Sequence, residues 1–172
     1  MPSKNSEPKI FGFTVFCDDI RTEADGKISY IGSYPSDMII HGEFPAILPK
    51  FGFGIKLLIR TDVASKIKSN VPIKILMPGE DITSSSISFE FPSEELMSQA
   101  NKSSPVSAKE SGNDSHPYFQ VNANLIVNSL SFKQAGRVCV RAVFGNEVVK
   151  LGSLGVQKAP TGVPESGDAV QT

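Results

Sequence analysis

The sequence predicts an all-β protein, a single antiparallel β-sandwich of the immunoglobulin-like or C2-like kind. Alternating apolar and polar runs follow one another, with turn residues roughly every 8 to 12 positions. We therefore expect about eight or nine strands and at most short helical turns, because helical periodicity of any length is missing. The length of 172 residues, with 40% hydrophobic and 20% charged residues, fits one soluble globular domain.

The composition changes at three places and so predicts the domain boundaries. Residues 1–8 are polar and contain two prolines, and we expect them to be disordered. Residues 158–172 carry few large apolar side chains and are expected to form a disordered tail. Between these ends, residues 9–157 should form the sandwich domain, with residues 98–118 as a mobile loop inside it.

The first strand is predicted from the run that begins at Phe11. Phe11, Phe13 and Val15 alternate with smaller or polar residues, a period of two that is typical of a half-buried strand with its apolar face toward the core. The pair Asp25-Gly26 predicts a turn into a second strand, and Pro35 should end that strand.

The later strands show the same alternation. A helical segment is open as an alternative at Thr61–Ser69, and a short helix is expected to begin at Ser93. The last three strands, joined in part by a Gly-Asn turn, are similar to the closing sheet of immunoglobulin-like domains. The predicted strands are Met38–Ile40, Phe51–Arg60, Val71–Met77, Ile87–Phe91, Phe119–Leu130, Arg137–Phe144 and Glu147–Val156.

The residues Phe16–Arg21 and Lys27–Tyr34 carry a family resemblance. The first segment reads FCDDIR and the second KISYIGSY, and Phe44-Pro45 follows shortly after. This order resembles an uncharacterised bacterial and phage-associated domain family of unknown function, in which a CDD-x-R start leads into a K-x-S-x-I-G-x-Y strand. The resemblance covers most of residues 10–157 and implies a small intracellular β domain, but no catalytic residues.

Charge and hydropathy exclude several classes of partner. The formal net charge is −1, and no basic stripe with interleaved aromatic residues is present, which argues against nucleic acid. No apolar run reaches the length of a membrane span, and the N-terminal residues lack the apolar core of a signal peptide. We therefore expect a cytoplasmic protein without a membrane partner.

The two cysteines leave two alternatives open. Cys17 and Cys139 lie on predicted strands far apart in the sequence, so they form either an inter-sheet disulfide or two buried free thiols. A reducing compartment favours the free thiols.

Acidic residues between the first two strands form the first candidate site. Asp18 and Asp19 can serve one site only if they lie in a loop, because neighbours on a strand point to opposite faces. With Glu23 and Asp25 they offer oxygen ligands for a divalent cation, although the spacing matches no calcium loop. The alternative is an acidic loop in which one aspartate accepts backbone N–H groups and the other pairs with Arg21.

Three further residues extend this candidate site. Arg21 is placed to pair with Asp37 or to receive an anionic ligand. His41 lies near Asp37 in the sequence, so the two form a candidate base and orienting carboxylate or half of a metal site. His116 falls in the predicted loop and should be solvated. We therefore predict a binding site made of Asp18, Asp19, Arg21, Asp37 and His41 at one end of the sandwich, with no metal and no cofactor assigned.

These observations favour a non-catalytic binding or protein-interaction module in a bacterial or phage context. Its partner would be a protein or a small anionic ligand. No Gly-x-Ser-x-Gly elbow or phosphate-binding loop is present, and no catalytic residue is assigned. Two alternatives stay open: a metal-assisted hydrolase or nuclease that uses the acidic loop, and an assembly protein. The latter would form homodimers or larger homo-oligomers through sheet edges such as Phe51–Arg60 or Glu147–Val156.

Overall fold

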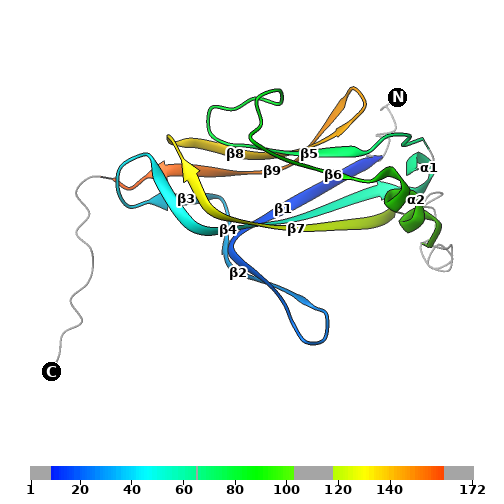
Figure 1. The fold of residues 1–172 in the computed structure, drawn as a ribbon, viewed down its shortest axis with the longest axis horizontal. Helices are drawn as coiled ribbons and strands as arrows, with labels where there is room; N and C mark the ends of the chain where they lie inside the picture. The colour runs from blue at the N-terminus through cyan, green and yellow to red at the C-terminus, as the bar shows by residue number, and fades with distance from the viewer. Residues whose placement is uncertain (1–8, 65, 103–117, 161–172) are drawn as a thin grey trace, which may run out of the picture.

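Two β-sheets face each other in the computed structural model, which describes residues 9–64, 66–102 and 118–160 (Figure 1). The first sheet has the order β2-β1-β4-β7, and the second has the order β3-β9-β8-β5-β6. The strands are β1 (Ile10–Thr22), β2 (Ile28–Tyr34), β3 (Asp37–Ile40), β4 (Ala46–Arg60), β5 (Val71–Leu76), β6 (Ile87–Phe91), β7 (Tyr118–Phe132), β8 (Gly136–Phe144) and β9 (Glu147–Lys158). The predicted all-β sandwich is confirmed. The predictions for residues 1–8, for 103–117 with His116, and for 161–172 lie outside the described residues.

Two details of the architecture differ from the expectation. The pair β3–β9 is parallel, whereas the other strand pairs are antiparallel. Helix α1 (Thr61–Ala64) is a single turn, but α2 (Ser93–Lys102) has 10 residues and occupies positions 98–102, where we expected a mobile loop. This helix is ordered because Leu96 inserts into the core and is 0% exposed.

The core lies between the sheets and depends most on β4. Its inward side chains, Phe51, Phe53, Ile55, Leu57 and Ile59, are all 0% exposed. Rings of neighbouring inward residues meet edge to face, as do Phe51 and Phe53 at 5.1 Å between centroids. No polar or charged residue is buried among the residues that the structure describes.

The prediction that the Phe11 and Phe13 face of β1 points to the core is wrong. Phe11 and Phe13 are 38% and 48% exposed, whereas Phe16 on the opposite face is buried. The reason is the close approach of β9: a Cβ on Gly12 would lie 2.9 Å from Leu151 Cδ2, so no large side chain fits inward there. Phe13 instead packs outside, 5.5 Å below the Lys56 ammonium.

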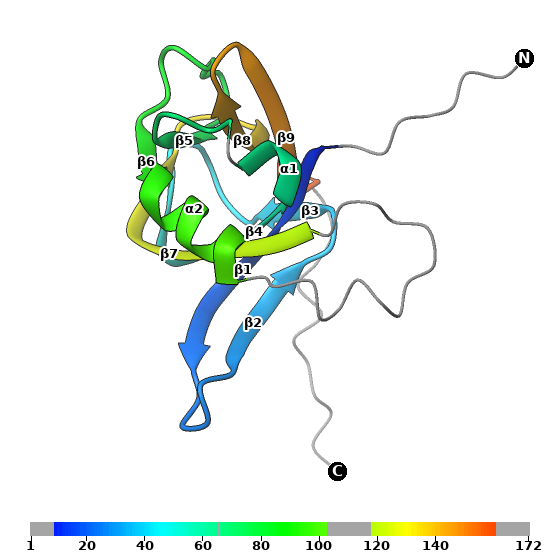
Figure 2. The same cartoon turned by 90° about the vertical axis from the view of Figure 1, so that its right-hand side faces the viewer.

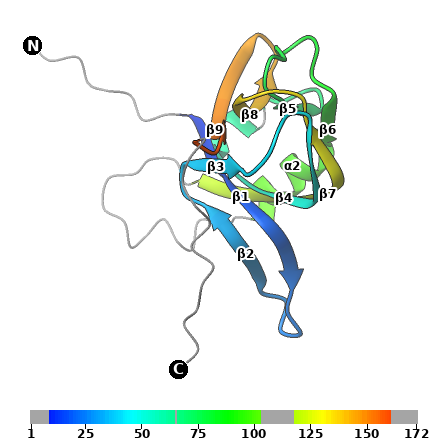
Figure 3. The same ribbon diagram turned by 90° about the vertical axis from the view of Figure 1, so that its left-hand side faces the viewer.

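The end of β1 and most of β2 form a hairpin that projects from the sandwich (Figure 2, Figure 3). The pairing of β1 with β4 ends at Cys17–Gly52, while its pairing with β2 continues to Thr22–Ile28. The base of this hairpin crosses the outer face of β4, where a Cβ on Gly54 would overlap the Tyr30 ring. The glycines of β4 thus mark a close neighbour.

Both cysteines are free thiols on the outer faces of different sheets. Cys139 lies between Val138 and Val140, which point inward and are 0% exposed, so its own side chain points outward. Cys17 packs beside Gly52 on the outside of the first sheet, where burial raises the pKa of its thiol. The structure therefore contains no inter-sheet disulfide between them.

The predicted edge strands are central strands. Phe51–Arg60 belongs to β4, which lies between β1 and β7, and Glu147–Val156 belongs to β9, which lies between β3 and β8. The true edges are β2 and β7 in one sheet and β3 and β6 in the other. Within the described ranges, no helix is both long enough and apolar enough to cross a membrane.

Candidate functional site

The acidic residues of the predicted site lie on a strand. Because β1 continues to Thr22, Asp18 and Asp19 are strand neighbours and point to opposite sides. The Tyr34 hydroxyl donates a hydrogen bond to Asp18, and burial, followed by this contact, raises the pKa of Tyr34 to about 12. The predicted acidic loop that would gather both carboxylates is absent, since the loop spans only residues 23–27.

Asp19 is the centre of a small ion-pair network. It pairs with the Lys50 ammonium and with Arg21 Nε, the latter at 3.0 Å, and it accepts the Ile20 N–H. These contacts, Lys50 first and Arg21 second, lower the pKa of Asp19 to about 2. An aspartate does pair with Arg21, but it lies on a strand rather than in a loop, and the same Asp19 also accepts the backbone N–H that we assigned to the other aspartate. The role of Lys50 was not foreseen.

Asp37 and His41 lie on the other sheet, in β3 and the turn after it. Asp37 accepts a hydrogen bond from Gln157 Nε2 at 3.1 Å. Arg21 pairs with Asp19 rather than with Asp37. In the described ranges no hydrogen bond or ion pair joins the two groups of the predicted site, and no three His, Cys, Asp or Glu side chains are grouped to hold a metal ion.

The open side of the sandwich offers a better candidate site. Edge strands β6 and β7 face this side, and α2 lies between them over one part of it (Figure 2). The helix contacts β7 and closes this part with the buried Leu96.

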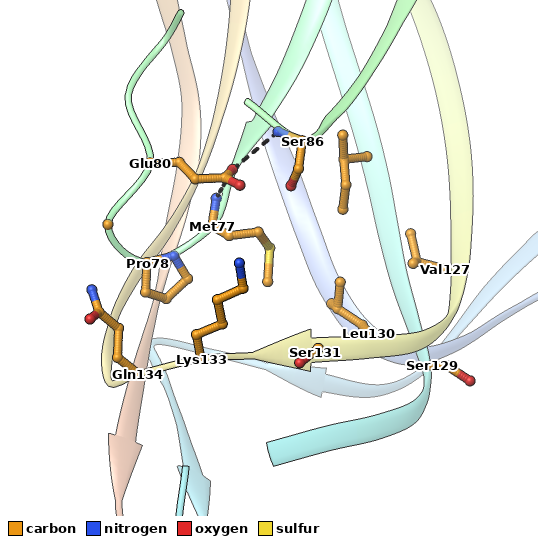
Figure 4. Close-up of a pocket in the computed structure, with 12 residues that line it drawn as sticks. Met77, Pro78, Glu80, Ser86, Val127, Ser129, Leu130, Ser131, Lys133 and Gln134 are labelled. Atoms are coloured by element: carbon orange, nitrogen blue, oxygen red, sulfur yellow. Dashed lines mark hydrogen bonds between the residues drawn. The ribbon is translucent and has the colours of Figure 1, made fainter. Parts of the chain in front are cut away.

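The other part of this side is a cleft of about 590 Å³ (Figure 4). One wall comes from the segment between β5 and β6, and the other from the C-terminal part of β7 and the residues after it. Its apolar floor is Met77, Ile87, Val127 and Leu130. Its remaining lining residues are Pro78, Gly79, Glu80, Ser86, Ser129, Ser131, Lys133 and Gln134.

Glu80 is held rigidly in the cleft. Its Oε2 accepts the Met77 N–H at 2.9 Å and the Ser86 N–H at 3.3 Å. Burial alone would raise its pKa, but these hydrogen bonds and the positive charge of Lys133 hold the pKa of Glu80 below its usual value. The carboxylate therefore stays ionised and oriented.

Lys133 faces Glu80 across the cleft. Its ammonium group points toward the carboxylate in Figure 4. Among the ion pairs of the described residues, none joins Lys133 to Glu80 within 4.0 Å. The cleft thus displays one negative and one positive group that do not bind each other.

Ser129 bends the β7 wall. With φ of 56°, it is the one non-glycine residue with positive φ in the described part of the chain. It lies opposite Pro49, between the pairs Lys50–Asn128 and Leu48–Leu130. Proline has no N–H to donate, so the ladder is interrupted here, and the alternation of β7 shifts so that Leu130 is buried.

Sequence reasoning did not identify Glu80 and Lys133, because nothing in the local pattern distinguishes them from surface charges. One signal was present: the apolar positions of β7 run through Val121, Ala123, Leu125 and Val127 and then skip to Leu130. Such a skip indicates that the inward face of the strand changes, and it does so at Ser129 although the register with β4 is the same on both sides.

Comparison with known proteins gives no relative from which a function can be transferred. No family model matches the chain, and neither a curated protein nor a solved structure matches it.

Proposed function

We propose that this protein is a non-catalytic protein-interaction module that binds an extended segment of a partner protein in the cleft between β6 and β7. The observation that carries the proposal is the uncovered part of the β7 edge. There, among the residues that the structure describes, β7 has β4 as a strand neighbour on one side only, and the cleft lies on its other side. The resemblance of residues 16–34 supports a bacterial or phage context.

The geometry of the edge favours an extended polypeptide over a compact ligand. A segment placed along Val127–Ser131 can pair with free main-chain groups of β7 and lay alternate side chains on the floor near Met77. This mode of recognition needs a long open edge.

The other edges fit this role less well. β3 has four residues and β6 has five, and short edge strands are poor templates for pairing. β2 has seven residues, about half the length of β7. Each of the two strands contains one positive-φ residue opposite a missing pair, Gly32 in β2 and Ser129 in β7, so length is what distinguishes them. β7, with 15 residues, is the longest of the four edges.

The chemistry of the cleft supports binding rather than catalysis. A general acid or base works best with a pKa near the working pH, whereas the pKa of Glu80 is lowered from an ordinary value that is already acidic. The hydrolase alternative required Asp18 and Asp19 in one site, and they point to opposite faces of β1.

A displayed library of random octapeptides tests the proposal. Peptides are enriched on the wild-type protein, and their affinities are then measured by fluorescence polarisation on two variants. Ser131→Arg places a long charged side chain in the cleft, and Ser33→Arg is the matched control on the exposed hairpin. We expect Ser131→Arg to weaken binding by about tenfold or more and Ser33→Arg to leave it unchanged. Equal binding to Ser131→Arg and wild type would show that the cleft is not the site.

A further inference from the structure

We infer that the cleft selects a segment that carries one basic and one acidic residue, separated by one residue, with the basic side chain binding Glu80 and the acidic side chain binding Lys133. This inference rests on the proposed function and specifies the chemistry of the partner. Its basis is a pair of opposite charges that share the cleft without pairing.

The first step concerns the acceptor capacity that Glu80 has left. Both backbone hydrogen bonds go to Oε2, and the Ser86 side chain also lowers the pKa of Glu80 by hydrogen bonding. A carboxylate has about four lone-pair sites, so it can still accept from a cation. Because the carboxylate is already fixed by Met77 and Ser86, a cation that binds it meets a preorganised acceptor. A lysine or arginine side chain forms the strongest hydrogen bonds to such a group.

The second step concerns Lys133. Its ammonium group has three donors, and no hydrogen bond or ion pair is found for it within the described ranges. It is near enough to lower the pKa of Glu80 but does not form an ion pair with it. An acidic side chain of the partner can therefore bind it.

The third step is the preference for both charges together. A segment with one basic residue is attracted by Glu80 but repelled by Lys133 across the cleft. A segment with one acidic residue is attracted by Lys133 but repelled by Glu80. A segment with both charges meets Glu80 and Lys133 with opposite signs, which lowers the cost of removing water from the pair.

The fourth step sets the spacing. In an extended segment, residues i and i+2 point to the same side and lie about 6.6 to 6.8 Å apart. Adjacent residues point to opposite sides, so only one of them would face the cleft. The pattern is therefore basic–x–acidic or acidic–x–basic, and the direction of the bound segment decides which.

The test is to sort the same octapeptide library on wild type, Glu80→Gln and Lys133→Gln. Glutamine at position 80 keeps a carbonyl oxygen for the Met77 and Ser86 N–H groups, so the fold should be retained, as circular dichroism can check. Glu94→Gln on α2 is the control for loss of an exposed carboxylate outside the cleft.

We expect wild type and Glu94→Gln to enrich peptides with both charges at this spacing. Glu80→Gln should lose the selection for the basic residue only, and Lys133→Gln that for the acidic residue only. Replacing the basic residue of an enriched peptide by Gln should weaken binding to wild type about tenfold, and binding to Glu80→Gln by much less.

Two outcomes would overturn the inference, and they are distinguishable. If enriched peptides are blocked by Ser131→Arg but show no charge preference, the cleft binds segments by their backbone and apolar residues, and only the inference fails. If no enriched peptide is blocked by Ser131→Arg, the proposed function fails with it.

Discussion

The two parts of the open side of the sandwich are built from the same pair of edge strands but are closed to different degrees. In one part α2 places Leu96 in the core, where it is 0% exposed. In the other part none of the described residues forms a helix, and the floor residues Ile87 and Val127 are only half-buried. The difference follows from length: 10 helical residues span about 15 Å, whereas the 15 residues of β7 span about 50 Å. A helix of this size covers only part of the edge.

The largest expected effect separates the two parts by stability. Leu96→Ala removes a fully buried side chain and should lower the free energy of unfolding by about 2 to 5 kcal/mol. Val127→Ala, at the floor of the cleft, removes a smaller and half-buried group and should cost about 1 kcal/mol or less. Urea unfolding of both variants measures the difference. Equal losses would mean that the cleft is packed like the helix-covered part.

A smaller effect concerns the backbone of β7, at one position in the cleft and at one position before it. Ser129 has φ of 56°. The substitution Ser129→Gly should raise the free energy of unfolding by up to about 1 kcal/mol, and Ser129→Val should lower it by about 1 to 2 kcal/mol. Asn122 is exposed and lies in the part of β7 before the cleft. Here Asn122→Val should be more stable than Asn122→Gly, because valine favours an ordinary strand and glycine does not. Thermal unfolding of the four variants gives both orders, and the same order at both positions would contradict this interpretation of Ser129.

The sandwich was predictable because alternation is a local property of the chain. The strands β4, β7, β8 and β9 were found from it, as was the Asp25-Gly26 turn, where Gly26 has φ of 80°. The inward face of β1 was not predictable, since it depends on how closely β9 approaches Gly12. Alternation shows that two faces differ but not which of them meets the other sheet.

The candidate site was less predictable than the fold for the same reason. Asp18 and Asp19 are adjacent in sequence, and this made them conspicuous, but adjacency on a strand separates their side chains. Glu80 and Lys133 are far apart in sequence and line the same cleft only because the segment after β5 and the residues after β7 border one opening. Long-range placement of this kind leaves no local pattern.

The smallest expected effect is the contribution of Glu80 to stability as a function of pH. Glu80 lies in the cleft, the part of the open side that α2 does not cover. Its folded pKa lies below the ordinary value of 4.5, so its contribution to stability is present above about pH 4.5 and is lost as the pH falls through the lowered value. Wild type should therefore exceed Glu80→Gln in free energy of unfolding by about 1 kcal/mol or less at pH 7. The excess should shrink below pH 4.5, as urea titrations at several pH values would show. An excess that stays constant into strong acid would mean that the two backbone N–H groups hold the neutral side chain equally well, and that Glu80 is not a preorganised charge.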